Sequence, residues 1–219
     1  GIEHQFLSIK SKTLNNDSPY FEKSHYGSLF GYAKYDALDN KYFPKRGWYF
    51  FGDYQSYLFS TDYTHQFNPF SIMKGDIGFA QTIFKKTTLK MQSEMGFTLG
   101  EESVHFFDFS LGGFGFAPVN NFKPFYGYDF LSIGGNSYIK ADITLDYEFY
   151  KKNHINASAN FANLENDLFQ NLDWVSLPTY TGYALGYGLE TIVGPVEAKY
   201  SWSPEIRQNY FWVSIGFWF

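Results

Sequence analysis

The sequence predicts an all-β fold: an antiparallel transmembrane β-barrel with about ten strands. Aromatic residues make up 23% of the 219 residues, and Tyr and Trp suit a boundary between apolar and wet surroundings. Several segments alternate strictly between apolar and polar residues, which is the period of a β-strand. No stretch approaches the roughly 20 consecutive apolar residues that a transmembrane helix needs. Because only every second residue of a barrel strand faces lipid, a mean hydropathy of −0.32 fits this fold.

Charge and cysteine content narrow the partners and the compartment. A net charge of −5 without a polybasic run argues against a nucleic-acid partner. The chain has no cysteine, which removes disulfides and thiolate metal sites and suits the oxidising periplasm and cell surface. Gly1–His4 has neither a basic nor an apolar signal region, so any signal peptide is expected to be removed or to lie upstream. We expect the bacterial outer membrane as location and its lipids as partner.

The clearest strand is the last one. An aromatic carboxyl terminus ends a set of apolar residues of one parity: Phe211, Val213, Ile215, Phe217 and Phe219. This pattern resembles the C-terminal signal by which outer-membrane barrels are recognised, so it implies the barrel assembly machinery as a partner. The other interpretation, that these are simply lipid-facing residues, is compatible. A hairpin through Ser203-Pro204-Glu205 should join this strand to residues 196–203.

Further strands are predicted upstream. Alternation is clear in 181–190, 139–149, 155–161 and 89–99, and less regular in 2–12, 25–38, 47–62 and 70–83. In 181–190 the small residues share one side, which can curve inward or accept a neighbouring plug. At about 9–11 residues per membrane strand, ten strands use nearly all of the chain. We therefore expect a single barrel domain over 1–219, with no room for a soluble catalytic domain.

The connections differ in length. Loops are predicted near 13–24, 39–46, 101–135 and 163–178, with a polar turn at 151–154. The two longest are candidates for extracellular loops or for a plug.

Charged residues in the strands could line a selective pore, or could pair carboxylates for acid/base work. We favour a hydrated wall in which opposite charges pair across strands. The predicted polar network of the lumen comprises Lys140, Asp142, Asp146, Glu148 and Glu190, with Glu197 and Lys199 on neighbouring strands.

Three segments together resemble a known family: Tyr35-Asp-Ala-Leu-Asp-Asn-Lys-Tyr-Phe-Pro-Lys-Arg-Gly-Trp48, His105-Phe-Phe-Asp-Phe-Ser-Leu-Gly-Gly113 and the run from Tyr180 to Phe219. They are similar to the bacterial surface-antigen superfamily of outer-membrane barrels, which includes the BAM insertase, two-partner secretion transporters and barrels fused to patatin-like phospholipases. The C-terminal run looks most like the patatin-like branch. This resemblance implies the final ten of sixteen strands, or a reduced barrel that closes with ten.

The resemblance also implies a long loop folded into the lumen, with Gly112, Gly113, Tyr126 and Gly127 as its characteristic residues. Insertases and transporters carry Arg-Gly-Phe or Arg-Gly-Tyr at the tip, whereas this chain has Tyr126 in place of the arginine. If Glu148 receives the loop, as the matching acidic residue does in the family, Lys123 is the expected partner.

Enzymatic chemistry is not predicted for this chain. Its histidines (His4, His25, His65, His105 and His154) are spread singly, without metal-ligand spacing, and are expected in loops or at interfaces. A Gly-x-Ser-x-Gly elbow is absent. No cofactor is therefore expected.

The leading hypothesis is a barrel that anchors, and exports or displays, a patatin-like lipase domain absent from this chain. The alternatives are an outer-membrane hydrolase with a rim site, for which His105, His154 and Asp108 are the residues to test, and a small porin or channel.

Overall fold

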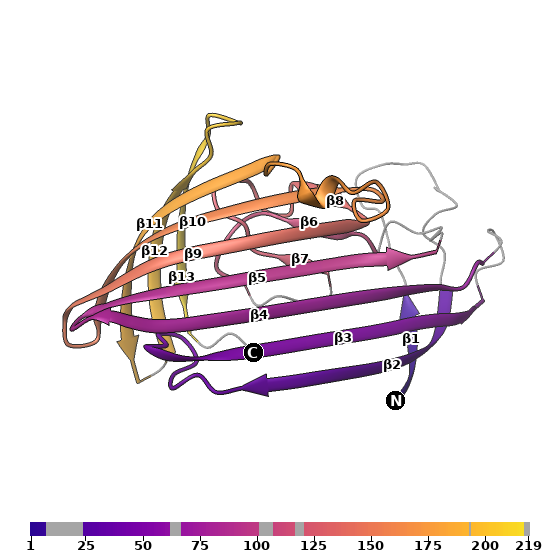
Figure 1. Ribbon diagram of the computed structural model, residues 1–219, viewed down its shortest axis with the longest axis horizontal. Coiled ribbons are helices and arrows are strands. Elements are labelled where there is room, and N and C mark those ends of the chain that lie inside the picture. Colours follow the sequence, from indigo (N-terminus) through magenta and orange to yellow (C-terminus); the bar gives the residue numbers. More distant parts are fainter. Residues whose placement is uncertain (8–23, 62–66, 101–106, 117–120, 193, 217–219) are drawn as a thin grey trace.

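One strongly curved antiparallel sheet dominates the computed structural model, which describes residues 1–7, 24–61, 67–100, 107–116, 121–192 and 194–216 (Figure 1). Its ten strands, in spatial order, are β1 (Ile2–Leu7), β2 (Ser24–Asp36), β3 (Arg46–Ser60), β4 (Phe70–Phe84), β5 (Thr87–Leu99), β9 (Ser137–Tyr150), β10 (Asn153–Glu165), β11 (Tyr180–Thr191), β12 (Gly194–Trp202) and β13 (Asn209–Ile215). Sequence neighbours are neighbours in the sheet. The predicted all-β fold with about ten strands is confirmed. In the described part of the chain, no helix has the length and apolar character to cross a membrane.

The connections at the two ends of the sheet differ in length. At one end, residues 85–86, 151–152 and 192–193 join neighbouring strands, while 37–45 form a longer turn between β2 and β3. At the other end, 203–208 form a short connection, 166–179 a longer one, and 100–136 between β5 and β9 the longest. Short periplasmic turns and long extracellular loops are typical of outer-membrane barrels.

The two faces of the sheet have opposite character. In β9, Ile143, Leu145 and Tyr147 point outward and are between 40% and 46% exposed, whereas Lys140 and Asp146 point inward and are buried. The predicted alternation is therefore confirmed, with apolar side chains outside. This is the reverse of a soluble domain, and it suits a wall whose outer face contacts lipid.

The connection between β5 and β9 packs on the inner face of the sheet. It carries a small sheet in the order β7-β6-β8, formed by Phe122–Lys123, Phe109–Leu111 and Ile133–Gly135. We call the described residues 107–116 and 121–135 of this connection the inner loop; Figure 1 shows them within the curve of the large sheet. The hydrophobic core combines this loop with inward residues of β2, β3, β4, β9 and β10: Tyr26, Tyr57, Phe70, Ile72, Phe107, Phe109, Leu111, Phe125, Tyr128, Ile133, Tyr138, Ala162 and Leu164.

Some predicted boundaries are wrong. The turn expected at 151–154 is only two residues long, and His154 is already buried inside β10 rather than lying in a loop. Likewise β10 continues to Glu165, past the loop expected from 163. Both wrong boundaries have the same physical reason. Polar side chains such as Asn163 are typical of loops, but on the inner face they find hydrogen-bond partners, so the strand continues through them.

The tip of the inner loop lies directly against the backbone of the wall. A Cβ atom on Gly182 of β11 would lie 1.9 Å from the carbonyl oxygen of Tyr126. Gly127 has φ +79°, and a Cβ there would lie 2.4 Å from the Trp202 carbonyl oxygen of β12. The small side of β11 therefore accepts the loop, as its alternation of large and small residues predicts.

We expect Gly182→Val to destabilise the folded chain by about 1–3 kcal/mol, because the added side chain must displace the loop tip or the strand. The matched control is Gly31→Val on the outer face of β2, where a Cβ meets no atom within 4 Å. Urea unfolding in detergent micelles measures both. An equal effect of the two substitutions would contradict the close packing of the tip.

Candidate functional site

A buried carboxylate links the inner loop to the wall. Glu94 of β5 binds Lys140 Nζ of β9 at 2.8 Å and Lys123 Nζ of the inner loop at 2.9 Å. Lys140 also pairs with Asp142 at 2.9 Å. The side chains of Glu94 and Lys140 are at most 4% exposed. Glu94 and Lys140 face each other in register, so opposite charges pair across strands here as predicted.

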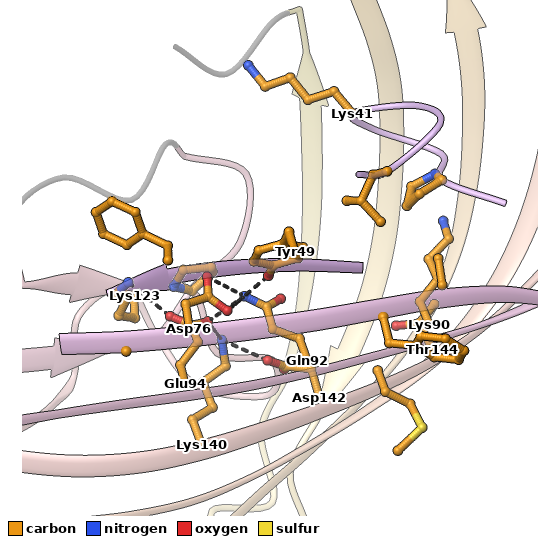
Figure 2. A pocket seen from close by; sticks show the side chains of 18 of the residues that line it. Lys41, Tyr49, Asp76, Lys90, Gln92, Glu94, Lys123, Lys140, Asp142 and Thr144 are labelled. Atoms are coloured by element: carbon orange, nitrogen blue, oxygen red, sulfur yellow. Dashed lines mark hydrogen bonds and ion pairs between the residues drawn. The ribbon is translucent and has the colours of Figure 1, made fainter. Parts of the chain in front are cut away.

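A neutral amide separates two neighbouring acids in this network (Figure 2). Asp76 of β4 lies directly opposite Glu94, a repulsive arrangement for two carboxylates. Gln92 Nε2 donates to both of them, at 3.1 Å to Asp76 and 3.1 Å to Glu94, and Tyr49 Oη donates to Asp76 at 2.9 Å. These donors offset the repulsion between the two carboxylates.

The network borders a cavity of about 710 Å³ between the inner loop and the wall. Figure 2 shows lysines and carboxylates from several strands around it. The cavity lining includes Lys74, Lys90, Lys123, Lys140, Asp53, Asp76, Glu94 and Asp142. Because both signs of charge are interspersed and largely paired, the cavity suits water better than a ligand of one charge sign.

A second cluster surrounds His154. Its Nδ1 lies 3.1 Å from Asp146 and its Nε2 lies 3.1 Å from Glu190. The doubly protonated imidazolium satisfies both carboxylates, since the neutral ring has a single N–H. Lys90 completes the cluster with a 2.7 Å pair to Asp146.

The turn between β2 and β3 closes over this cluster. Phe43 is buried and stacks on the His154 ring with centroids 4.3 Å apart. The turn is held in shape by Asp39, which accepts the amides of Lys45 and Arg46, and by Asn40, which accepts the amides at positions 42 and 43. This is the Leu-Asp-Asn-Lys-Tyr-Phe-Pro segment that the sequence singled out as a turn.

Glu148 binds this turn and not the inner loop. Its Oε2 lies 2.6 Å from Lys45 Nζ, and this hydrogen bond raises the pKa of Lys45. The expected pairing of Glu148 with Lys123 is therefore wrong, because Lys123 binds Glu94 instead. Glu148 lies at the short-turn end of β9, within reach of the Lys45 side chain.

The tip of the inner loop holds a lysine of the wall. Lys199 of β12 donates to the Tyr126 hydroxyl at 2.9 Å, and its Nζ lies 4.8 Å from the Tyr126 ring centroid. Phe114 faces the same ammonium at 4.7 Å. Lys199 is thus buried in an aromatic cage, where cation–π attraction compensates lost hydration.

A polar cluster around Glu205, in the connection between β12 and β13, also fastens the inner loop. The Tyr128 hydroxyl donates to Glu205 at 3.3 Å, and Thr181 donates to Glu205 at 2.6 Å. Burial raises the pKa of Glu205, but the hydrogen bonds from Ser203 and Thr181 outweigh it and hold that pKa below its usual value.

The other predicted site residues are placed as follows. Gly112 and Gly113 make internal bonds of the inner loop, to the carbonyl oxygens of Lys123 and Tyr128. In β13, Phe211, Val213 and Ile215 are exposed on the outer face, while Phe217 and Phe219 lie outside the described residues.

Sequence reasoning missed Glu94 and Phe43. The signal for Glu94 was available, because Lys90, Gln92 and Glu94 share the polar parity of β5. Nothing in the local sequence indicated that Phe43 would reach His154.

The rim-hydrolase hypothesis gains no support from His154, since both of its ring nitrogens bind carboxylates and neither is left for a serine. His65 and His105 lie outside the described residues. His4 and His25 hydrogen-bond each other at 3.0 Å on neighbouring strands.

An apolar outer face, a polar inner face and a loop packed inside the curve define an outer-membrane β-barrel protein. The model of the OMP85 superfamily matches residues 1–219, so the chain belongs to the OMP85 superfamily. The expected location, the bacterial outer membrane, is confirmed. A barrel of this kind is a membrane domain that is not itself catalytic.

Among solved structures, the chain is similar to the crystal structure of BamA from Haemophilus ducreyi lacking POTRA domains 1–3. The TM-score is 0.63 at 15% sequence identity, and the match covers 84% of this chain and 40% of that chain. At this identity the likeness concerns the fold alone. A search of the curated proteins finds no match.

We expect Glu94→Gln to destabilise the chain by about 3 kcal/mol, because it leaves Lys140 and Lys123 buried without their shared counter-charge. The matched control is Asp53→Asn, which breaks a pair with Lys74 whose side chains are 22% and 18% exposed. That loss should be about 1 kcal/mol or less, since the pair lies nearer to water. Urea unfolding in micelles compares them, and equal losses would contradict the central role of Glu94.

Proposed function

We propose that this chain is a single barrel domain with a filled interior that anchors, and exports or displays, a patatin-like lipase domain in the outer membrane. In this proposal the ten strands are the final ten of sixteen, or a reduced barrel that closes with ten. The observation that carries the proposal is the inner loop packed on the polar face. A filled interior favours anchoring over free diffusion through a pore.

The attachment of the inner loop supports a static role. It is fixed at three places: Lys123 on Glu94, Tyr126 on Lys199, and Tyr128 on Glu205. Each of these attachments includes a residue that is at most 5% exposed: Glu94, Lys199 and Tyr128. Displacing the loop would remove Lys123 from Glu94, which would keep Lys140, and would remove the Tyr126 hydroxyl from the buried Lys199. Such losses are costly for buried charges.

The chemistry of the tip supports anchoring over active secretion. Insertases and transporters of the superfamily carry an arginine where this chain has Tyr126. Here the cation is on the wall, at Lys199, and the tip contributes a hydroxyl and two aromatic rings. At this contact the loop encloses a charge of the wall, whereas at Lys123 it presents its own charge to Glu94.

The lipase part of the proposal rests on the sequence from Tyr180 to Phe219, which looks most like the C-terminal barrel of patatin-like phospholipases. The chain spans 40% of the BamA structure that it matches, so the activity of the whole protein is itself part of the proposal.

We also propose that β13 is read by the barrel assembly machinery. Phe211, Val213 and Ile215 form an exposed apolar row on this edge strand of the described sheet. With Phe217 and Phe219 they make the C-terminal signal that the sequence predicts.

Conductance in planar bilayers tests the filled interior. The full-length protein should be silent, and replacing residues 107–132 with a short Gly-Ser linker should open a measurable conductance. The matched control shortens residues 166–179, another loop at the same end, and should stay silent. An open wild-type channel would instead support the porin alternative.

The full open reading frame and a phospholipid hydrolysis assay test the fused domain. We expect a Gly-x-Ser-x-Gly elbow upstream of Gly1, and hydrolysis by the full-length protein that is lost when the elbow serine is replaced by alanine. This chain alone should be inactive. An upstream sequence without such an elbow, or a full-length protein without hydrolysis, would overturn the lipase proposal and leave the anchor role intact.

A further inference from the structure

The connection between β10 and β11 presents an unusual set of side chains to the outside. Leu172, Trp174, Val175 and Leu177 are 66%, 42%, 69% and 89% exposed. From position 168 to 178, Asp173 is the single charged residue. An apolar patch of this kind marks a surface that meets a membrane or a partner.

This patch continues the outer apolar face of the wall. Phe169 of the connection contacts Phe97 of β5 with ring centroids 5.0 Å apart, and Trp174 lies 6.2 Å from Phe169. Phe97 has the outward parity of Met95 and Leu99, both exposed. Figure 1 shows the connection as the orange coil at the long-loop end of the sheet. The lipid-facing surface therefore runs from β5 onto this connection.

The backbone of the connection is prepared for an apolar environment, in which an unpaired N–H or C=O is costly. Its amides donate within the connection: Gln170 and Asn171 to the Asp167 oxygen, Asp173 to the Leu168 oxygen, Val175 to the Leu172 oxygen and Ser176 to the Asp173 oxygen. A compact turn in which these amides are paired internally can turn its apolar side chains toward lipid.

The wall holds this conformation in place. Asn163, which is 4% exposed, donates to the carbonyl oxygens of Asp173 and Ser176 at 3.3 Å each and accepts the Thr179 amide at 2.7 Å. Leu172 has φ +63°, a left-handed conformation that glycine or asparagine adopts more easily. The geometry of the turn therefore does not account for a leucine at this position, whereas the need for an exposed apolar side chain does.

We propose that residues 169–177 form an interfacial anchor whose exposed apolar side chains, Leu172, Trp174, Val175 and Leu177, insert into the outer leaflet of the outer membrane. The occupant is lipid because the patch is continuous with the lipid-facing wall, and because the long-loop end of such barrels lies at the outer leaflet. Trp174 belongs to this patch, and amphipathic aromatic rings such as that of Trp favour the interface between membrane and water. The proposal depends on the outer-membrane location of the superfamily and not on the lipase domain.

Spin labelling tests the anchor directly, because the chain has no native cysteine. Val175→Cys and Leu177→Cys carry a nitroxide in protein reconstituted into lipid bilayers. Ile143→Cys on the outer face of β9 is the lipid reference, and Lys151→Cys in the β9–β10 turn is the aqueous reference. We expect labels at 175 and 177 to collide with oxygen several-fold more than with a water-soluble nickel chelate, as at 143.

Collision ratios at 175 and 177 that match Lys151→Cys would overturn the proposal. Spin–spin broadening at these positions would also overturn it, by assigning the patch to a second copy of the chain. If a cysteine variant fails to fold, brominated lipids provide the second measurement: Trp174→Phe, which removes one of the five tryptophans, should lower the share of tryptophan fluorescence that these lipids quench. No change in quenching would count against insertion.

Discussion

The structure depends on one constraint: successive residues of each strand meet opposite environments. Lipid outside requires apolar side chains, and every polar group that points inward must find a partner inside. In β9 this alternation places Leu145 in the lipid-facing surface and Asp146 next to His154 and Lys90. The side chains of the inner face consequently need partners. The inner loop supplies them through Lys123 and through the hydrophobic core that it shares with the wall. Filling the interior is thus a consequence of how the wall is patterned.

The sequence predicts the wall well and the contacts inside it poorly. Period-two alternation located the strands because each face has a uniform environment, and the glycines of β11 correctly indicated a close neighbour. Pairings across the interior join residues far apart in the sequence, so no local pattern specifies them. Lys123 was expected on Glu148 and binds Glu94; His154 was expected in a turn and is buried beneath Phe43. The polar character of Asn163 suggested a loop because its partners come from a later segment.

The tip of the inner loop illustrates how a family feature can be rebuilt with different chemistry. Tyr126 stands where relatives have arginine, yet the tip still meets the wall through a charged hydrogen bond, donated by Lys199. Because the ammonium is fixed on β12 and surrounded by Phe114 and Tyr126, the loop gains attraction from its rings at this contact without contributing a charge to it. Here the wall carries the donor and the loop carries the acceptor. This reversal preserves the attachment of the loop but changes the free energy needed to release it.

The turn between β2 and β3 has a consequence for the order of folding. Its contact between Lys45 and Glu148 spans 103 residues of sequence, so the entropy of closing that loop opposes it until the intervening strands have paired. Phe43 likewise finds its place only when β10 supplies His154. Contacts with such long sequence separation form slowly. Docking of this turn is therefore expected late in maturation, as a closing step that becomes stable only on a wall whose curvature is already complete.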